Sequence, residues 1–408
     1  MKRITLRAIV AFLTFAVGIS TSALWVVHSR QIKHRIAAPI SFVETPHGVQ
    51  ATADKPMLEM VFVLDTTGSM SGLIEGAKQR IWGIVNEVMQ SPSQPSVRIG
   101  LVAYRDRGDR YVTQVLPLTD DLDKVYATLM DYRAEGGGDT PEDVRTALAD
   151  GVDRAGWSRQ SKNGEHISQI LFLVGDAPPH DDYQDAPDTL DTTRRAIESG
   201  MIVNTIQCGA ANDTRQVWQS IAQNGEGQYF AIAQDGGVQA VASPYDDKLS
   251  ELGAKLGSTY TAYGGGAGTA GANFRSEVTA RQAEMEASVV ARAPKAAAAD
   301  RAVNKALNSV AYSDDLMQSL ENGTVKMDAI KDENLPDDLR KLPADTRKKE
   351  IEKRLEERKK LRAEIVALSK QRDAYIAAER KKQSVGKQGG FDSAVAAALK
   401  QQMQRRRK

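Results

Sequence analysis

The stretch Met57–Met70, MLEMVFVLDTTGSM, joins an apolar run to a cluster of polar side chains. The run from Met60 to Leu64 contains β-branched and aromatic residues and is typical of a strand buried on both faces of a parallel sheet. Beyond it, apolar residues recur at spacings of three and four and predict a helix: Leu73, Ala77, Ile81, Ile84 and Val88. The polar cluster therefore lies at the carboxyl end of a parallel strand, where open α/β sheets bind their ligands.

The polar cluster is suited to binding a metal ion. Asp65, Thr67 and Ser69 alternate along the chain, so their three side-chain oxygens can converge on one point. Oxygen ligands without nitrogen or sulfur suit a hard cation, which predicts Mg²⁺, with Mn²⁺ and Ca²⁺ as alternatives.

At these residues the chain resembles a von Willebrand factor type A domain. The phrases FVLDTTGSM, GLVAYRDRGD, GGGDTPED and FLVGDAPPH are most similar to bacterial members of that family. The metal-ion-dependent adhesion site of the family has the pattern Asp-x-Ser-x-Ser on this loop, and here Thr67 replaces the first serine and keeps its hydroxyl. The resemblance implies that Thr140 and Asp176, on two further loops, complete the ligand set. It also implies that the metal bridges to an Asp or Glu carboxylate of a protein partner, with Asp65 and Asp176 acting partly through waters.

The remainder of residues 57–262 alternates strand and helix patterns, which predicts an α/β fold with a doubly wound, mostly parallel sheet. One antiparallel edge strand is expected at 110–118, because the link 105–109 from the strand at 96–104 is too short for a crossover and Pro117 suits an edge. Further strands are expected at 167–175, 201–208 and 228–233, and helices at 120–132, 188–199, 213–224 and 244–256, with another beginning at Pro141.

The composition restricts compartment and partners. The formal net charge of +1 gives no overall signal for binding a polyanion, so no nucleic acid partner is expected. The single cysteine, Cys208, excludes an internal disulfide and lies in an apolar run, which predicts a buried thiol. A basic start followed by an almost uncharged run to Val27 predicts an export signal, either cleaved near Ala23 or kept as an inner-membrane anchor. The location expected is therefore periplasmic or otherwise extracytoplasmic.

The chain divides by composition into six segments. Those after the α/β domain are a Gly-rich linker, a charged α-helical region that offers a surface for oligomerisation, and a basic, flexible tail in which residues 391–404 are expected to form a last short amphipathic helix. The long helix expected at 346–382 has an irregular apolar stripe, because Arg358 and Arg372 fall on positions that a coiled coil would fill with apolar residues. The segments are 1–30 (signal peptide or signal anchor), 31–56 (linker), 57–262 (α/β domain), 263–275 (Gly-rich linker), 276–383 (helical region) and 384–408 (tail).

The function expected is metal-dependent protein binding, in adhesion or assembly at the cell envelope. The first alternative is a metal-dependent hydrolase centred on Asp176 and His180, with the histidine as general base near a metal-bound water. The α/β domain at 57–262 lacks a GxSxG elbow, a Walker phosphate loop and the Rossmann glycine pattern, and so the sequence favours a binding module over an enzyme. A scaffold that acts without metal is the second alternative.

Overall fold

The computed structural model describes residues 56–91, 95–158, 167–235, 237, 241–308, 312, 314–383 and 390–405. The predicted signal or anchor at 1–30 and nearly all of the predicted linker at 31–56 lie outside these ranges. Within them, no helix is both long enough and apolar enough to cross a bilayer.

Six strands form one sheet in the order β3-β2-β1-β4-β5-β6. All neighbours pair in parallel except β2 and β3, which are antiparallel, with a register shift between Ile99 and Leu101. The prediction of a mostly parallel sheet with one antiparallel edge strand is therefore confirmed. The strands are β1 (Met57–Asp65), β2 (Ser96–Tyr104), β3 (Thr113–Thr119), β4 (Ile167–Gly175), β5 (Met201–Cys208) and β6 (Glu226–Ile232).

The alternation of side chains along β1 separates two cores, one on each face of the sheet. Leu58, Met60 and Phe62 point into a core shared with α2 (Ser71–Met89) and α3 (Leu122–Asp131). Val61 and Val63 point into the opposite core, shared with three helices: α4 (Val144–Asp153), α5 (Thr189–Glu198) and α6 (Asn212–Asn224). Helices on both faces explain why the strands are apolar without interruption.

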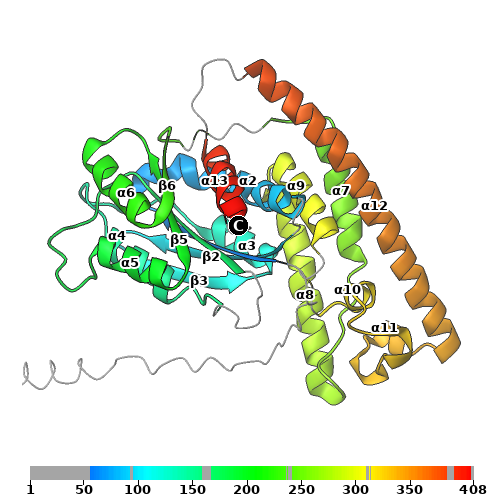
Figure 1. The fold of residues 1–408 in the computed structure, drawn as a ribbon. Helices are drawn as coiled ribbons and strands as arrows, with labels where there is room; N and C mark the ends of the chain where they lie inside the picture. The colour runs from blue at the N-terminus through cyan, green and yellow to red at the C-terminus, as the bar shows by residue number, and fades with distance from the viewer. Residues whose placement is uncertain are drawn as a thin grey trace, which may run out of the picture. The chain divides into compact units, whose positions relative to one another are not determined.

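The chain continues into a set of helices that packs against the sheet domain (Figure 1). Asn86 of α2 donates a hydrogen bond of 2.8 Å to the backbone carbonyl of Asp300 in α9, and Arg301 donates to both carboxylate oxygens of Asp123 in α3 at 2.6 Å. The helical region is therefore part of the same compact unit as the sheet. The helices that follow β6 are α7 (Asp246–Ser258), α8 (Gly268–Arg292), α9 (Lys295–Leu307), α10 (Leu316–Glu321), α11 (Asp337–Arg340), α12 (Ala344–Gln383) and α13 (Phe391–Arg405).

Within the tail predicted at 384–408, residues 391–405 form α13, in agreement with the short helix expected at 391–404. This part of the tail is packed helix and not flexible chain. In Figure 1 this helix (red) lies beside α2, and it also contacts β5 and β6. Phe391 is 1% exposed, with its ring centroid 6.0 Å from that of Phe62. Asn204, buried in β5, exchanges two hydrogen bonds with Gln402, at 3.1 and 2.6 Å. The amphipathic pattern at 391–404 thus predicted the helix, but not that its apolar side chains join the core on the α2 face of the sheet.

The predicted Gly-rich linker at 263–275 is also too long, because α8 begins at Gly268. The buried guanidinium of Arg275 donates hydrogen bonds to the carbonyls of Gly264 and Gly266 at 2.7 and 3.0 Å, and to that of Glu333 at 3.0 Å. Gly264 and Gly266 have positive φ angles of +124° and +72°, which glycine adopts without strain. The glycines therefore form a defined turn, and the Arg275 side chain binds its carbonyls.

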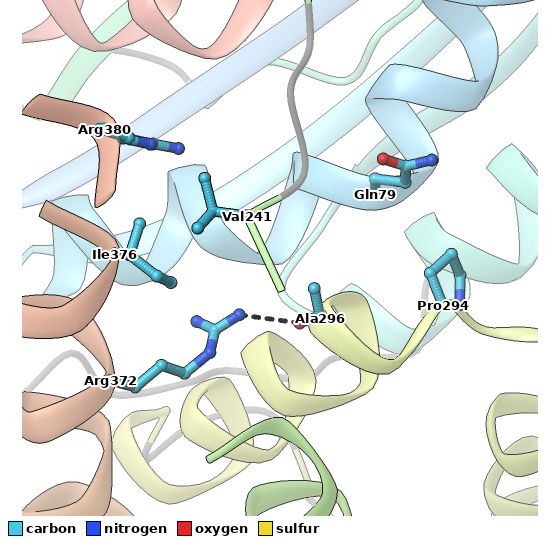
Figure 2. Close-up of a pocket in the computed structure, with 7 residues that line it drawn as sticks. All are labelled: Gln79, Val241, Pro294, Ala296, Arg372, Ile376 and Arg380. Carbon is cyan, nitrogen blue, oxygen red and sulfur yellow. Dashed lines mark hydrogen bonds between the residues drawn. The ribbon is translucent and has the colours of Figure 1, made fainter. Parts of the chain in front are cut away.

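Buried arginines and apolar side chains together hold α12 against the other helices. Ile351 and Ile365 of α12 are buried in two separate apolar clusters. Arg372 pairs with Asp246 of α7 and Asp300 of α9, both at 2.6 Å. Figure 2 shows Arg372 reaching from α12 toward α9, where it also donates to the Ala296 carbonyl at 3.2 Å. The small cavity beside it, about 20 Å³, has room for about one water molecule. It is too small for a ligand site.

Candidate metal centre

Three loops meet at the carboxyl edge of the sheet, where the chain leaves β1 toward α2 on one face and leaves β4 toward α5 on the other. Such a switch point opens a crevice between neighbouring loops. The crevice here is an open pocket of about 240 Å³. It is lined by Thr67, Gly68, Ser69, Gly136, Gly137, Asp139, Thr140, Glu142, Asp176 and Ala177.

The first loop brings three of the predicted ligands together. Asp65 is the last residue of β1 and is fully buried. Its Oδ1 accepts hydrogen bonds from the Thr67 backbone N–H at 2.8 Å and from the Thr67 hydroxyl at 2.6 Å. The Thr67 and Ser69 hydroxyl oxygens lie 3.3 Å apart. Thr67 thus occupies the place between the carboxylate and Ser69 that the DxTxS spacing predicts.

The second loop is fixed to the first by backbone hydrogen bonds. The Gly68 N–H donates to the Gly136 carbonyl at 3.1 Å, and the Glu135 N–H donates to the Thr66 carbonyl at 3.1 Å. Gly136 has a φ of +81°, and a Cβ on it would overlap the Asp109 carboxylate, so only glycine fits there. This loop places exposed Thr140 at the rim of the pocket.

The helix expected to begin at Pro141 begins instead at Val144. Its N-cap is Asp143, whose Oδ1 accepts from the Thr146 N–H at 3.0 Å, so Thr140 is not the cap. The helix starts later than expected because residue 142 is bound to the neighbouring loop. The Glu142 N–H donates to the Pro178 carbonyl at 3.0 Å, and the His180 N–H donates to the Glu142 carbonyl at 3.2 Å. This short parallel bridge keeps residue 142 extended.

The third loop supplies Asp176, directly after β4. The Gln234 amide donates to its Oδ2 at 2.5 Å and to the Ser69 carbonyl at 3.5 Å. The side chains of Thr67, Ser69, Thr140 and Asp176 therefore line one pocket, with Asp65 buried beside Thr67.

Glu142 is a site residue that sequence reasoning missed. It lines the pocket and is only 3% exposed. Burial, together with the negative charges of Asp65 and Asp106, raises its pKa to about 9. From the sequence alone, Glu142 is one of the acidic residues expected in the first turn of a helix. The bridge to Pro179, which the sequence does not predict, turns its side chain inward.

Two buried carboxyl oxygens at this site have no hydrogen-bond partner among the described residues: Asp65 Oδ2 and Glu142 Oε2. Burial, with a further contribution from the charge of Asp176, raises the pKa of Asp65 to about 7 even though hydrogen bonds from Thr67 lower it. Unpartnered acceptors among like charges are what a cation relieves. The donors are carboxylates and hydroxyls only, so the residues fit a hard divalent ion.

His180 lies on the same loop as Asp176 but contacts other carboxylates. Its Nδ1 is 2.9 Å from Asp182 Oδ1, and its Nε2 is 3.5 Å from Asp106 Oδ2 and 3.8 Å from Asp139 Oδ2. The described side-chain contacts of Asp176 and His180 are thus with different partners. Cys208 is buried, as predicted.

Residues 59–244 match the family model of the von Willebrand factor A domain. Similar sequences include von Willebrand factor A domain-containing protein 7 of Mus musculus and of Homo sapiens, 40% and 39% identical over 93 residues, 23% of this chain and 10% of each relative. A putative ariadne-like RING finger protein of Acanthamoeba polyphaga mimivirus is 28% identical over 127 residues, 31% of this chain and 12% of that protein. The chain spans about a tenth of the length of the curated relatives it matches.

Similar solved structures include the conserved hypothetical protein BatB from Bacteroides thetaiotaomicron, with a TM-score of 0.31, 15% identity, and coverage of 44% of this chain and 90% of that one. The SpRpn10 VWA domain has a TM-score of 0.31, 17% identity, and coverage of 44% of this chain and 89% of that one.

Proposed function

Because residues 59–244 form a von Willebrand factor A domain, which suggests a protein-interaction module, we propose that this chain binds a protein partner through a Mg²⁺-dependent site. The partner would offer an Asp or Glu carboxylate to the pocket lined by Thr67, Ser69, Thr140 and Asp176.

The observation that carries the proposal is the pair of buried carboxyl oxygens, Asp65 Oδ2 and Glu142 Oε2, that have no partner among the described residues. A buried acceptor without a donor costs about 1–3 kcal/mol, and more when it is charged. A site that keeps two such oxygens beside three hydroxyl side chains is better explained by a cation than by structure alone.

Each residue has a defined part in the proposed site. Thr67, Ser69 and Thr140 would offer neutral hydroxyl oxygens, and Asp65 and Asp176 would offer the carboxylates, directly or through water. When bound, a divalent ion held by so few charges would supply an open coordination position for an outside carboxylate. Gln234 and the backbone bonds between the loops hold these side chains in place.

Binding is favoured over hydrolysis by the contacts of His180. A general base must reach the reacting water near the ion. The ring nitrogens of His180 lie instead against Asp106, Asp139 and Asp182. We therefore place no catalytic role on this residue.

The proposed setting is the cell envelope, supported by the basic and then apolar pattern of residues 1–27. Fractionation of cells that express the full chain tests it. Recovery in the extracytoplasmic or membrane fraction is expected, and recovery only in the cytosol would contradict it.

Calorimetric titration of the full chain with Mg²⁺ and Mn²⁺ tests the site itself. Thr67→Val removes the hydroxyl while nearly keeping the side-chain shape, and should weaken metal binding at least tenfold. Thr66→Val is the matched control: its hydroxyl donates to the Tyr104 carbonyl at 2.8 Å and does not line the pocket. It should bind metal like the wild type.

The carboxylate step is tested on the Mn²⁺-loaded chain by water proton relaxation. Adding acetate, or a peptide with a single glutamate, should lower the relaxivity because a carboxylate replaces an exchangeable water. A folded chain that binds no divalent ion with or without the carboxylate would contradict the proposal. So would equal binding by both threonine variants.

A further inference from the structure

We propose a second metal centre, built by His180, Asp106 and Asp139, that binds a borderline divalent ion of the Zn²⁺ class. It goes beyond the proposed function, because none of its three side chains is among the proposed Mg²⁺ ligands. The imidazole and the two carboxylates each offer one ligand atom, and the three atoms all lie within 4.8 Å of one another.

The spacing of these atoms suits ligands of one ion better than partners in a hydrogen bond. His180 Nε2 is 3.5 Å from Asp106 Oδ2 and 3.8 Å from Asp139 Oδ2, beyond the 2.7–3.2 Å of a good N–H···O bond. Ligands bound tetrahedrally to zinc at about 2.0–2.1 Å are separated by about 3.4 Å.

The hydrogen bond on the other side of the ring sets its tautomer. His180 Nδ1 lies 2.9 Å from Asp182 Oδ1, and an ionised carboxylate only accepts, so Nδ1 carries the proton. The lone pair of the neutral ring is then on Nε2. That atom is buried and has no hydrogen-bond partner among the described residues. Metal-bound histidines are commonly oriented by such a carboxylate on the opposite nitrogen.

Tyr183 orients two of the three ligands. Its ring stacks on that of His180, with centroids 4.2 Å apart and planes at 13°. Its hydroxyl donates to both oxygens of Asp106, at 2.9 and 3.1 Å. The side chains of His180 and Asp106 are 12% and 9% exposed, whereas Asp139 is 61% exposed and leaves the site open to solvent.

The local charge also favours a cation. Arg105 and Arg107 flank Asp106 in the chain, but both pair with other carboxylates. Arg105 pairs with Glu135 at 3.7 Å, and Arg107 pairs with Asp143 at 3.1 Å and Asp185 at 2.8 Å. In the described ranges, neither Asp106 nor Asp139 forms an ion pair with a lysine or arginine. Because one ligand is an imidazole nitrogen, the site suits Zn²⁺ or a similar ion rather than Mg²⁺. Three protein ligands leave a position for water.

The three ligands come from three different loops. Asp106 follows β2, Asp139 precedes α4 and His180 follows β4. Asp139 also lines the pocket of the proposed Mg²⁺ site and directly precedes Thr140. An ion at His180 would therefore fasten the loop that carries Thr140, and would stabilise the rim of the first site without entering it.

The test is metal binding by the full chain, stripped with EDTA and then kept in saturating Mg²⁺. Zn²⁺ is titrated against a chromogenic chelator, and Co²⁺ is followed by its visible absorption. The wild type is expected to bind one Zn²⁺ per chain and to give a Co²⁺ band of low coordination number. His180→Gln should lose at least a hundredfold in Zn²⁺ affinity and lose the Co²⁺ band. Asp191→Asn, which changes an exposed carboxylate that pairs with Arg194 at 2.9 Å, is the control and should behave as the wild type.

Two further variants distinguish loss of a ligand from loss of the fold, and a ligand from a residue that positions one. Asp139→Asn changes an exposed side chain, so the fold should survive while Zn²⁺ binding weakens; circular dichroism checks the fold. Asp182→Asn tests the positioning carboxylate and should lower Zn²⁺ affinity about 10- to 100-fold while keeping the Co²⁺ band at high metal concentration.

Zn²⁺ binding that is equal in the wild type and His180→Gln would overturn the second centre, and so would the absence of Zn²⁺ binding by the folded wild type. Thr67→Val makes the two proposals distinguishable. It should bind Mg²⁺ at least tenfold more weakly and bind Zn²⁺ like the wild type, so either site can fail without the other.

Discussion

Gly175 lies at the site in a position where any side chain would collide with its neighbours. A Cβ there would overlap the Tyr104 hydroxyl and lie 3.1 Å from Asp65 Oδ2. The glycine lets the end of β4 approach the end of β1 closely enough to bring Asp176 beside Asp65.

We expect Gly175→Ala to lower the free energy of unfolding by about 1–3 kcal/mol, the usual cost of forcing extra volume into a packed region. Urea unfolding measures the change. Gly138→Ala is the control, because a Cβ on Gly138 would meet nothing within 4 Å, and it should change stability by less than about 1 kcal/mol. Equal effects of the two changes would contradict this account.

A second residue-scale feature is the buried ionic group that joins α8 and α9. Glu286 accepts from Arg301 at 2.8 Å and from Lys305 at 2.6 Å. Burial alone would raise the pKa of Glu286, but the hydrogen bond from Arg301 and the charge of Lys305 outweigh it and lower that pKa to about 2.

The folded-state pKa of Glu286 lies below its ordinary value of 4.5. The ionised carboxylate therefore stabilises the fold above about pH 4.5, and this stabilisation is lost as pH falls toward 2. We expect the wild type to exceed Glu286→Gln in stability by up to about 3 kcal/mol near pH 6. The difference should shrink steadily below pH 4.5. Urea unfolding of both proteins across this range is the measurement, and a constant difference would be inconsistent with the ion pair.

At the residue scale, the sequence was informative where a ligand side chain follows a strand directly. Asp65 and Asp176 are placed by strand ends, so the apolar runs before them located both. Glu142 and Gln234 could not be found in this way. The first is turned inward by the bridge to Pro179, and the second reaches Asp176 from a turn after β6.

At the scale of elements, the arginines of α12 explain why its stripe looked irregular. Arg358 pairs with Asp315 at 2.7 Å, and Arg372 pairs with Asp246 and Asp300. Their partners come from short or neighbouring helices far away in the sequence. A heptad pattern treats these arginines as defects, because it holds no information about the aspartates that face them.

We expect Arg372→Met to lower the free energy of unfolding by about 3–5 kcal/mol, because it removes the buried cation that pairs with both Asp246 and Asp300. Lys360→Met is the control on the same helix. Lys360 and its partner Glu356 are 76% and 62% exposed, and exposed pairs contribute about 0–1 kcal/mol. If Arg372→Met unfolded no more easily than Lys360→Met, the buried ion pairs would not be what holds α12.

The existence and order of most strands and helices were predictable. Buried strands are continuous apolar runs, and helices repeat apolar residues at spacings of three and four. The boundaries of the linker and the tail were not. Glycine and basic residues favour flexible chain on average, and only packing shows that Arg275 binds the glycine turn or that Phe391 enters the core.

At the scale of the whole described unit, the sheet domain does not end where its family pattern ends. The core on the α2 face includes Val289, Ala297 and Ala298 as well as Phe391 and Val395. A fragment cut near residue 262 would keep α2 and α3 on that face but would lose these side chains from its core.

We expect a fragment of residues 56–263 to bind the dye ANS and to unfold with free energy lower by at least about 4 kcal/mol than the full chain, since losing a buried phenylalanine alone costs about 3–5 kcal/mol. Phe391→Ala in the full chain should reproduce much of the loss. A fragment as stable as the full chain, without ANS binding, would show that the later helices are dispensable for the fold.

The position of α13 also bears on how the protein reaches its folded state. The strands pair with one another over shorter separations, the longest being that between β1 and β4, whereas Phe391 meets Phe62 only after a much longer loop has closed. Until that closure, a partly folded chain presents the apolar side of its central strands to water and to other chains. The slow step is therefore also the interval in which aggregation competes, and a chaperone that shields this face would be most useful then.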